Sequence, residues 1–140
     1  MLLQLSQDGR LSNVKLAARI GLTPAPSLRQ GKRLEADGVI AGYRARLSPE
    51  ATGRSFSVYM HVEITMTSRE VVERFETTVA AFTEVSEVRR VYGAQVDYII
   101  RVDVADGNAY ERFQSEKMYP LPGVNRIVSY PTMKLIKSSD

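Results

Sequence analysis

Cysteine is absent from the 140 residues of this chain, and histidine occurs only once, at His61. Without thiols the chain forms neither disulfide bonds nor a thiolate metal site, and one imidazole is too few for a histidine-based zinc centre. No phosphate-cradling glycine loop and no nucleophile with an adjacent base can be recognised. We therefore expect no metal, no cofactor and no enzymatic activity.

Long apolar runs are missing as well, so we expect no membrane-spanning segment. The opening residues, MLLQLSQDGR, become polar too soon for a signal peptide. We expect a cytoplasmic protein.

Positive charge is concentrated at the front of the chain. Eight basic and four acidic residues lie within the first 50 positions, a net charge of +4, whereas the whole chain carries +3. The remaining residues therefore sum to −1. A basic front and a nearly neutral back are typical of a nucleic-acid-binding module joined to a module with another role.

Residues 12–43 are organised as two short helices joined by a tight turn. Ser12 can cap the first helix, because its hydroxyl can accept hydrogen bonds from the free N–H groups of the first turn. An apolar stripe at helical spacing follows, formed by Val14, Leu16, Ala17 and Ile20. Gly21 suits a left-handed helix end, and Thr23 with Pro24 suits the start of the next helix. This layout predicts a helix-turn-helix that reads duplex DNA, preceded by a short helix over 1–7.

The second helix, predicted over 24–36, has an apolar side and a basic side. Arg29 and Gln30 can offer paired donors and acceptors to base edges in a major groove, whereas later basic residues suit phosphates. The residues expected to contact bases are Thr23, Ala25, Pro26, Ser27, Arg29 and Gln30. Those expected to hold phosphates are Lys32, Arg33, Arg44 and Arg46. The alternative interpretation is a solvated basic helix face without a partner.

Apolar and polar residues alternate over part of the segment 39–47, which is predicted to be the wing or a linker strand. Residues 48–54, SPEATGR, carry proline, glycine and small polar residues without periodicity, which is typical of a domain boundary. We therefore predict a DNA-binding domain over 1–47, a linker over 48–54 and a second domain over 55–140.

The second domain is predicted to contain four strands and two helices. The hydrophobic periodicities predict strands over 55–67, 84–92, 95–104 and 124–137. They predict helices over 68–82 and 106–119, so the order along the chain is strand, helix, strand, strand, helix, strand. This order is the ferredoxin-like βαββαβ pattern, with an antiparallel sheet and both helices on one face. Tyr59, Ile99 and Ile127 are expected on the opposite face, where a second copy in a homodimer would cover them. The fold class is therefore α+β.

The stretch LAARIGLTPAPSLRQGKRLEADGVIAGYRARL resembles the DNA-binding half of the Lrp/AsnC, or feast/famine, transcriptional regulators. The family pattern is a helix ending in Gly-Leu, then Ser-Pro-small, then Arg-x-x-x-Leu-Glu-x-x-Gly-Val-Ile. Two positions depart from it: Gly31 stands where a branched apolar residue is usual, and Gln30 replaces a common arginine. The second half also resembles the family, as a dimeric α/β barrel. The resemblance implies a homodimer, often assembled further into an octameric ring of dimers.

The connection 91–98, VYGAQVDY, resembles the family's Gly-x-x-Asp-Tyr signature beside the amino-acid effector site, with one more residue between Gly93 and Asp97 than the common form has. The resemblance assigns effector binding to Gly93, Asp97 and Tyr98. Asp97 could accept hydrogen bonds from an ammonium group, and backbone N–H groups around Gly93 could donate to a carboxylate. The alternative is a plain hairpin turn with a surface aspartate.

We therefore predict a sequence-specific DNA-binding transcriptional regulator that responds to an amino acid or a related metabolite. Its partners would be double-stranded DNA, the effector and a second copy of the chain. The alternative is a ferredoxin-like metabolite-binding or enzymatic dimer without DNA function. Steep salt dependence of binding to duplex DNA would distinguish the two, because counterion release accompanies phosphate contacts.

Overall fold

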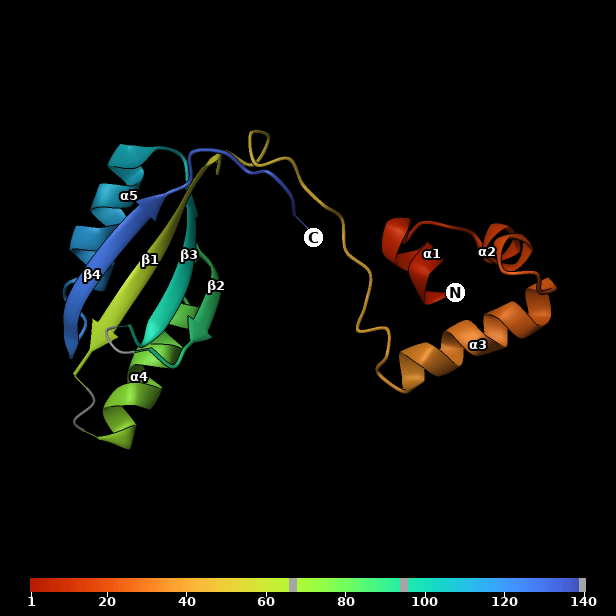
Figure 1. Ribbon diagram of the computed structural model, residues 1–140, viewed down its shortest axis with the longest axis horizontal. Helices are drawn as coiled ribbons and strands as arrows, with labels where there is room; N and C mark the ends of the chain where they lie inside the picture. The colour runs from red at the N-terminus through yellow and green to blue at the C-terminus, as the bar shows by residue number, and fades with distance from the viewer. Residues whose placement is uncertain (66–67, 94–95, 139–140) are drawn as a thin grey trace. The chain divides into compact units, whose positions relative to one another are not determined.

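A computed structural model describes residues 1–65, 68–93 and 96–138 of the chain. The chain divides into two compact units, Met1–Arg46 and Leu47–Asp140. Residues 48–54, predicted to be a linker, are grouped with the second unit. Figure 1 shows the helices and strands of each unit.

The first unit contains three helices, α1 (Leu2–Gln7), α2 (Asn13–Arg19) and α3 (Pro24–Ala36). The Ser12 hydroxyl accepts a hydrogen bond from the Lys15 amide at 3.3 Å, so the predicted cap of α2 is confirmed. Gly21 has a φ of 71°, and the Leu22 amide donates to the Ala17 carbonyl at 2.9 Å, which closes the helix end. Within the predicted apolar stripe, Leu16 and Ala17 are buried, but Val14 is 64% exposed.

Helix α3 begins at Pro24 and ends at Ala36, as the sequence predicts. Pro24 occupies the first turn, where a missing N–H costs nothing. The Asn13 side-chain amide donates to the Pro24 carbonyl at 2.7 Å and ties α2 to the start of α3. This contact fixes the turn between the two helices.

The predicted wing strand over 39–47 is wrong. No strand forms in this fully described segment, which runs without regular pairing, and nearly all of it is exposed to solvent. Its alternation of apolar and polar residues is incomplete, and no described strand lies beside it to pair with its backbone groups. Two hydrogen bonds tie it to α3: the Ile40 amide donates to the Leu34 carbonyl at 3.0 Å, and the Tyr43 hydroxyl donates to the Glu35 carboxylate at 3.1 Å.

The second unit is a four-stranded sheet with helices against it (Figure 1). The elements are β1 (Phe56–Ile64), α4 (Arg69–Ala80), β2 (Val85–Arg90), β3 (Tyr98–Val104), α5 (Gly107–Phe113) and β4 (Val124–Pro131). A π-helical turn, Gln114–Met118, continues α5. The strand order is β2-β3-β1-β4 and all described pairs are antiparallel, which confirms the predicted α+β, ferredoxin-like domain.

One face of the sheet carries the hydrophobic core of this unit. Alternate residues of β1 and β3 are buried there together with residues of both helices, so α4 and α5 cover the same face. The sheet contributes Val58, Met60, Val62, Ile64, Tyr98, Ile100, Val102 and Val104, and the helices contribute Val72, Phe75, Val79, Tyr110 and Phe113. Met66, which the alternation also assigns to this face, lies outside the described residues.

Two details of the last strand differ from prediction. Strand β4 ends at Pro131, whereas the sequence predicts it to continue to residue 137. Ile127 pairs with Val62 and packs against the core, so its predicted position on the uncovered face is wrong. The uncovered face instead receives Val128, which pairs with His61, and Tyr130, which pairs with Tyr59.

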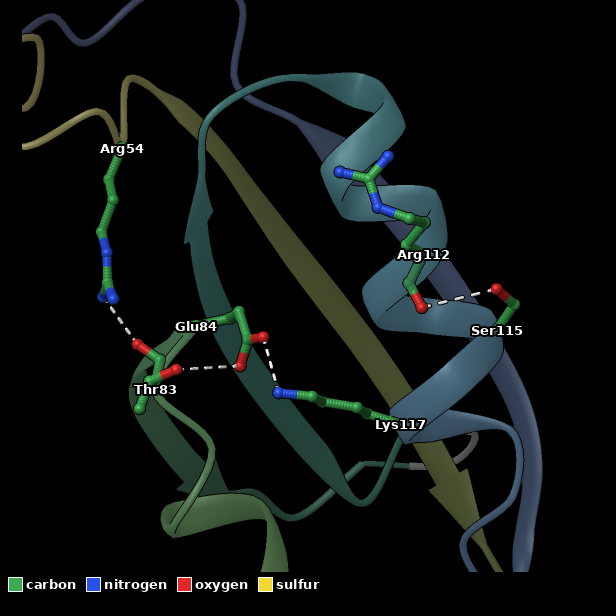
Figure 2. A network of polar contacts seen from close by, with 6 residues as sticks. All are labelled: Arg54, Thr83, Glu84, Arg112, Ser115 and Lys117. Carbon is green, nitrogen blue, oxygen red and sulfur yellow. Dashed lines mark hydrogen bonds and ion pairs between the residues drawn. The ribbon is translucent and has the colours of Figure 1, made fainter.

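The segment before β1 is held to the second unit by a polar network (Figure 2). The Arg54 guanidinium donates to the Thr83 carbonyl at 2.6 Å, just before β2. The adjacent Glu84 carboxylate accepts a hydrogen bond from the Lys117 ammonium at 2.7 Å, and this ammonium lies 5.4 Å from the centre of the Phe82 ring. The π-helical turn is thereby joined to the α4–β2 connection.

Candidate functional site

Helix α3 presents most of its predicted DNA-contacting residues to solvent. Thr23 and Ala25 are exposed at its start, Pro26 is half-buried, and Arg29 and Gln30 are exposed further along. The opposite side of the helix carries Leu28 and Gly31 toward α1 and α2, where Leu16 is buried. The helix is therefore anchored on one side and open on the other, as major-groove reading requires.

Ser27 is the exception among these candidates. It is 1% exposed, and its hydroxyl oxygen finds no hydrogen-bond partner among the described residues. The sequence prediction that Ser27 contacts a base is corrected here, because a side chain packed behind the helix cannot reach DNA. Its position follows from the helical period, since Ser27 lies one turn before Gly31 on the inner side.

The predicted phosphate-binding residues are all exposed. Lys32 and Arg33 lie on α3, whereas Arg44 and Arg46 lie on the extended segment after it. Arg33 forms an ion pair with Asp37 at 3.5 Å, and both side chains are more than half exposed. Such surface pairs are weak, about 0–1 kcal/mol, so a phosphate can replace Asp37.

Asp97 occupies a junction between β1 and the loop before β3. Its carboxylate accepts a hydrogen bond from the Ile64 amide at 2.8 Å, and its own amide donates to the Val62 carbonyl at 3.0 Å. Its carbonyl accepts from the Val91 amide at 2.9 Å. The side chain predicted to receive an ammonium group thus already holds the end of β1, a contact that no sequence signal revealed.

Gly93 and Tyr98 lie in different environments at the two ends of this loop. Gly93 is exposed, and a β-carbon there would approach the Val96 carbonyl oxygen to 3.3 Å. Tyr98 is fully buried, its ring 4.9 Å from that of Phe75, and its hydroxyl donates to the Glu76 carboxylate at 2.6 Å. Burial and this carboxylate raise the pKa of Tyr98 well above its ordinary value.

Tyr98 is therefore part of the core, and the expectation that its side chain contacts an effector is corrected. Residues 94 and 95, also within the predicted signature, lie outside the described residues. Gly93 and Asp97 remain the candidates for effector binding.

The face of the sheet opposite the helices carries aromatic and charged side chains. Tyr59 is 40% exposed and Tyr130 is 51% exposed, and the Tyr130 ring lies 4.7 Å from that of His61. Arg101 forms an ion pair with Asp103 at 3.2 Å on the same face. No described helix or strand lies over this face, although residues of the segments before β1 and after β4 line a hollow beside Tyr59, Arg101 and Asp103. Tyr59 and Tyr130 are exposed enough to contact a partner.

Both units match known protein families. The model of the Lrp/AsnC ligand binding domain matches residues 57–140, and a model of winged helix-turn-helix DNA-binding domains matches residues 1–41. The leucine-responsive regulatory protein of Escherichia coli K12 is 37% identical over 137 residues, which cover 98% of this chain and 83% of that protein. The chain belongs to the Lrp/AsnC family.

Solved structures of Lrp/AsnC regulators resemble the chain over its whole length. A transcriptional regulator of Neisseria meningitidis in complex with L-Met has a TM-score of 0.91 and 32% identity, covering 96% of this chain and 86% of that one. An AsnC family transcriptional regulator from Agrobacterium tumefaciens has a TM-score of 0.92 and 33% identity, covering 98% and 88%. The resemblance inferred from the sequence is confirmed.

Membership in the Lrp/AsnC family makes the chain a DNA-binding transcriptional regulator. The matched relatives are regulators, so the enzymatic alternative is set aside. Within the described ranges, no helix is long and apolar enough to cross a membrane. The same ranges contain no group of three His, Asp or Glu side chains that could hold a metal ion.

Proposed function

We propose that α3 enters the major groove of an operator and that Arg29 and Gln30 read base edges there. Thr23, Ala25 and Pro26 approach the DNA with the first turn of the helix. The observation that carries this proposal is the two-sided character of α3, which is packed on the Ser27 side and open on the Arg29 side. Arg29 has the forked donor geometry that suits guanine.

The phosphates flanking the groove are held by Lys32, Arg33, Arg44 and Arg46, all of them exposed cations. Phosphate contacts position a protein on the duplex without reading its sequence. The two kinds of contact therefore predict different consequences when a single arginine is removed.

The test compares Arg29→Ala with Arg33→Ala on an operator selected from random duplexes and on unrelated DNA. Arg29→Ala should weaken operator binding by about 1–3 kcal/mol and relax the preference at one base position. Arg33→Ala should weaken binding to both duplexes and reduce the slope of log affinity against log salt by about one. Equal weakening on both duplexes by Arg29→Ala would assign that residue to a phosphate instead.

An amino acid is the proposed effector, bound beside Gly93 and Asp97. The relative from Neisseria meningitidis was solved with L-Met, which supports an amino-acid ligand for this family domain. Amide groups near Gly93 would donate to the carboxylate, and Asp97 would accept from the ammonium group. L-methionine is therefore the first ligand to test.

Asp97→Asn separates the two roles of this carboxylate. An asparagine oxygen can still accept from the Ile64 amide, which Asp97 now bonds at 2.8 Å, but it carries no charge for an ammonium ion. We expect Asp97→Asn to fold normally and to lose L-methionine binding measured by calorimetry. Unchanged affinity in this variant would exclude Asp97 as the ammonium acceptor.

A homodimer formed through the uncovered sheet face is the proposed assembly, with an octamer of four dimers as its higher form. The exposed rings of Tyr59 and Tyr130 support burial of this face by a second copy. Two copies would place two α3 helices in successive major grooves. Tyr130→Glu should shift the mass measured by sedimentation equilibrium toward the monomer, whereas Tyr119→Glu, on an exposed residue after α5, should not.

A further inference from the structure

His61, the single histidine of the chain, lies on the sheet face that the helices leave uncovered. It belongs to β1, an inner strand, and its partners in register are Ile99 of β3 and Val128 of β4. The His61 ring is half-buried, and its centre lies 4.7 Å from the centre of the Tyr130 ring. A molecule that covers this face therefore also covers the imidazole.

The charged side chains on this face balance one another. The register of the described strands places six of them on the same side of the sheet as His61: Arg89, Arg101, Arg126, Glu63, Glu87 and Asp103. Arg101 forms an ion pair with Asp103 at 3.2 Å, and Arg89 forms one with Glu87. The formal charges that the strands contribute to this face therefore cancel while His61 is neutral.

The immediate surroundings of His61 favour its neutral form. A hollow beside the ring is lined by His61, Val96, Arg126, Val128 and Tyr130. Among these residues Arg126 carries the one formal charge, and its sign is that of a protonated imidazole. Glu63, two residues further along β1, does not line this hollow, and its carboxylate accepts a hydrogen bond from the Asn125 side-chain amide at 2.9 Å. A nearby like charge and removal from water both disfavour a charged histidine.

Charged residues of the segments before β1 and after β4 lie at another part of the face. Glu50, Arg54, Lys134 and Lys137 line the hollow beside Tyr59, to which His61 does not contribute. They therefore provide no carboxylate that would stabilise a protonated His61 from within its own copy.

We propose that His61 makes the homodimer sensitive to pH, with the neutral imidazole favouring the dimer. This inference rests on the proposed homodimer through the uncovered sheet face. Two sheets that pack face to face exclude water from the side chains between them, so each copy would bury its own imidazole. Histidine changes its charge between about pH 5 and 8, and the monomer, whose ring remains partly in water, would take up this proton more readily than the dimer. Acid therefore shifts the chain toward the monomer.

The test measures the dissociation constant of the dimer by sedimentation equilibrium at about pH 8 and about pH 5.5. The constant for the unsubstituted chain should rise about tenfold or more in acid, because dissociation takes up as many as two protons, one for each copy. His61→Gln keeps a polar side chain that cannot be protonated in this range. This variant should form a dimer at pH 8, and its dissociation constant should change less than about twofold. Carboxylates and the terminal amine are the same in both chains, so the comparison isolates the imidazole.

The ring signals of His61 in the NMR spectrum provide a second measurement, which does not require the dimer to dissociate. A proton that loosens the dimer must also bind the dimer less tightly than the monomer. In a concentrated, dimeric sample the ring should therefore titrate at a lower pH than histidine in a short blocked peptide. Titration at the same pH as the peptide, or at a higher pH, would overturn the proposal.

Sedimentation separates failure of the homodimer from failure of this inference. A chain that is monomeric at pH 8 would refute the homodimer and, with it, the role of His61. A dimer whose dissociation constant stays the same or falls in acid would refute the role of His61 alone. Equal weakening of the unsubstituted chain and of His61→Gln would assign the pH dependence to other groups. The amide signals of β3 define the pH range, which extends only over values at which the second unit remains folded.

Discussion

Replacement of Gly31 by alanine is expected to stabilise the DNA-binding unit. Gly31 lies in the interior of α3, where glycine is disfavoured relative to alanine by about 0.8–1.0 kcal/mol. The added methyl group meets no heavy atom within 4 Å among the described residues outside its own helix, so no steric cost reduces this gain. Gly31→Ala should therefore raise the free energy of unfolding of this unit by about 1 kcal/mol.

Gly38→Ala is the matched control. The surroundings of Gly38 are equally open within the described structure, but its φ of +71° lies in the left-handed region that disfavours side chains. Alanine there should lower the free energy of unfolding by about 1–2 kcal/mol. The two variants add the same methyl group in open surroundings, yet their stabilities should differ by about 2–3 kcal/mol.

Urea unfolding of the full chain, followed by resolved amide signals, measures the two units separately. Signals from α2 and α3 should shift to higher urea in Gly31→Ala and to lower urea in Gly38→Ala, while signals from β3 keep their midpoint. A loss of stability in Gly31→Ala would refute the reasoning, because it would mean that position 31 is either not regular helix or not open.

Three further outcomes follow from particular contacts. Ser12→Ala should destabilise the first unit by about 1 kcal/mol, because the Ser12 hydroxyl caps α2. Thr23→Ala should destabilise it less, because Thr23 makes no side-chain cap bond in the described structure. Urea unfolding of the two variants measures this difference. Asp106→Ala should destabilise the second unit by about 1 kcal/mol in the same assay, because Asp106 caps α5 through the Ala109 amide at 2.8 Å. Lys117→Met should lower stability at pH 7 by less than about 1 kcal/mol. Burial raises the pKa of the Glu84 carboxyl, but its hydrogen bonds, mainly to Lys117, outweigh this effect and lower the pKa. The stabilisation from the ionised carboxylate is therefore present above pH 4.5 and is lost as the pH falls through the lowered pKa. The difference in unfolding free energy between Lys117→Met and the unsubstituted chain should accordingly be smaller at pH 3 than at pH 7.

The helices were predictable from the sequence because their ends carry local signals. Ser12, Ser68 and Asp106 all cap helices through their side chains, and each stands directly before its helix in the sequence. Gly21 and Pro24 mark the turn before α3. These signals act over one helical turn, so they do not depend on the rest of the fold.

The faces of β4 could not be predicted in the same way. Ile127 and Val128 are adjacent and both apolar, so the pattern of this strand does not indicate which of them faces the core. The pairing with β1 decides it, because Val62 lies opposite Ile127 and His61 opposite Val128. This register shifts between Glu63 and Ile64, an irregularity that a strictly alternating pattern does not contain.

Tyr98 shows where periodicity and family resemblance give different answers. Its alternation with Ile100, Val102 and Val104 predicts a side chain in the core, and the structure confirms that position. The resemblance assigned the same residue to effector binding because it belongs to a signature. A signature records which residues recur together, but Asp97 lies in the loop before β3, whereas Tyr98 is the first residue of that strand and faces the core. Neighbouring positions in the sequence therefore do not give Asp97 and Tyr98 the same role. The Tyr98 hydroxyl donates to Glu76 and ties β3 to α4, whereas the Asp97 carboxylate holds the end of β1.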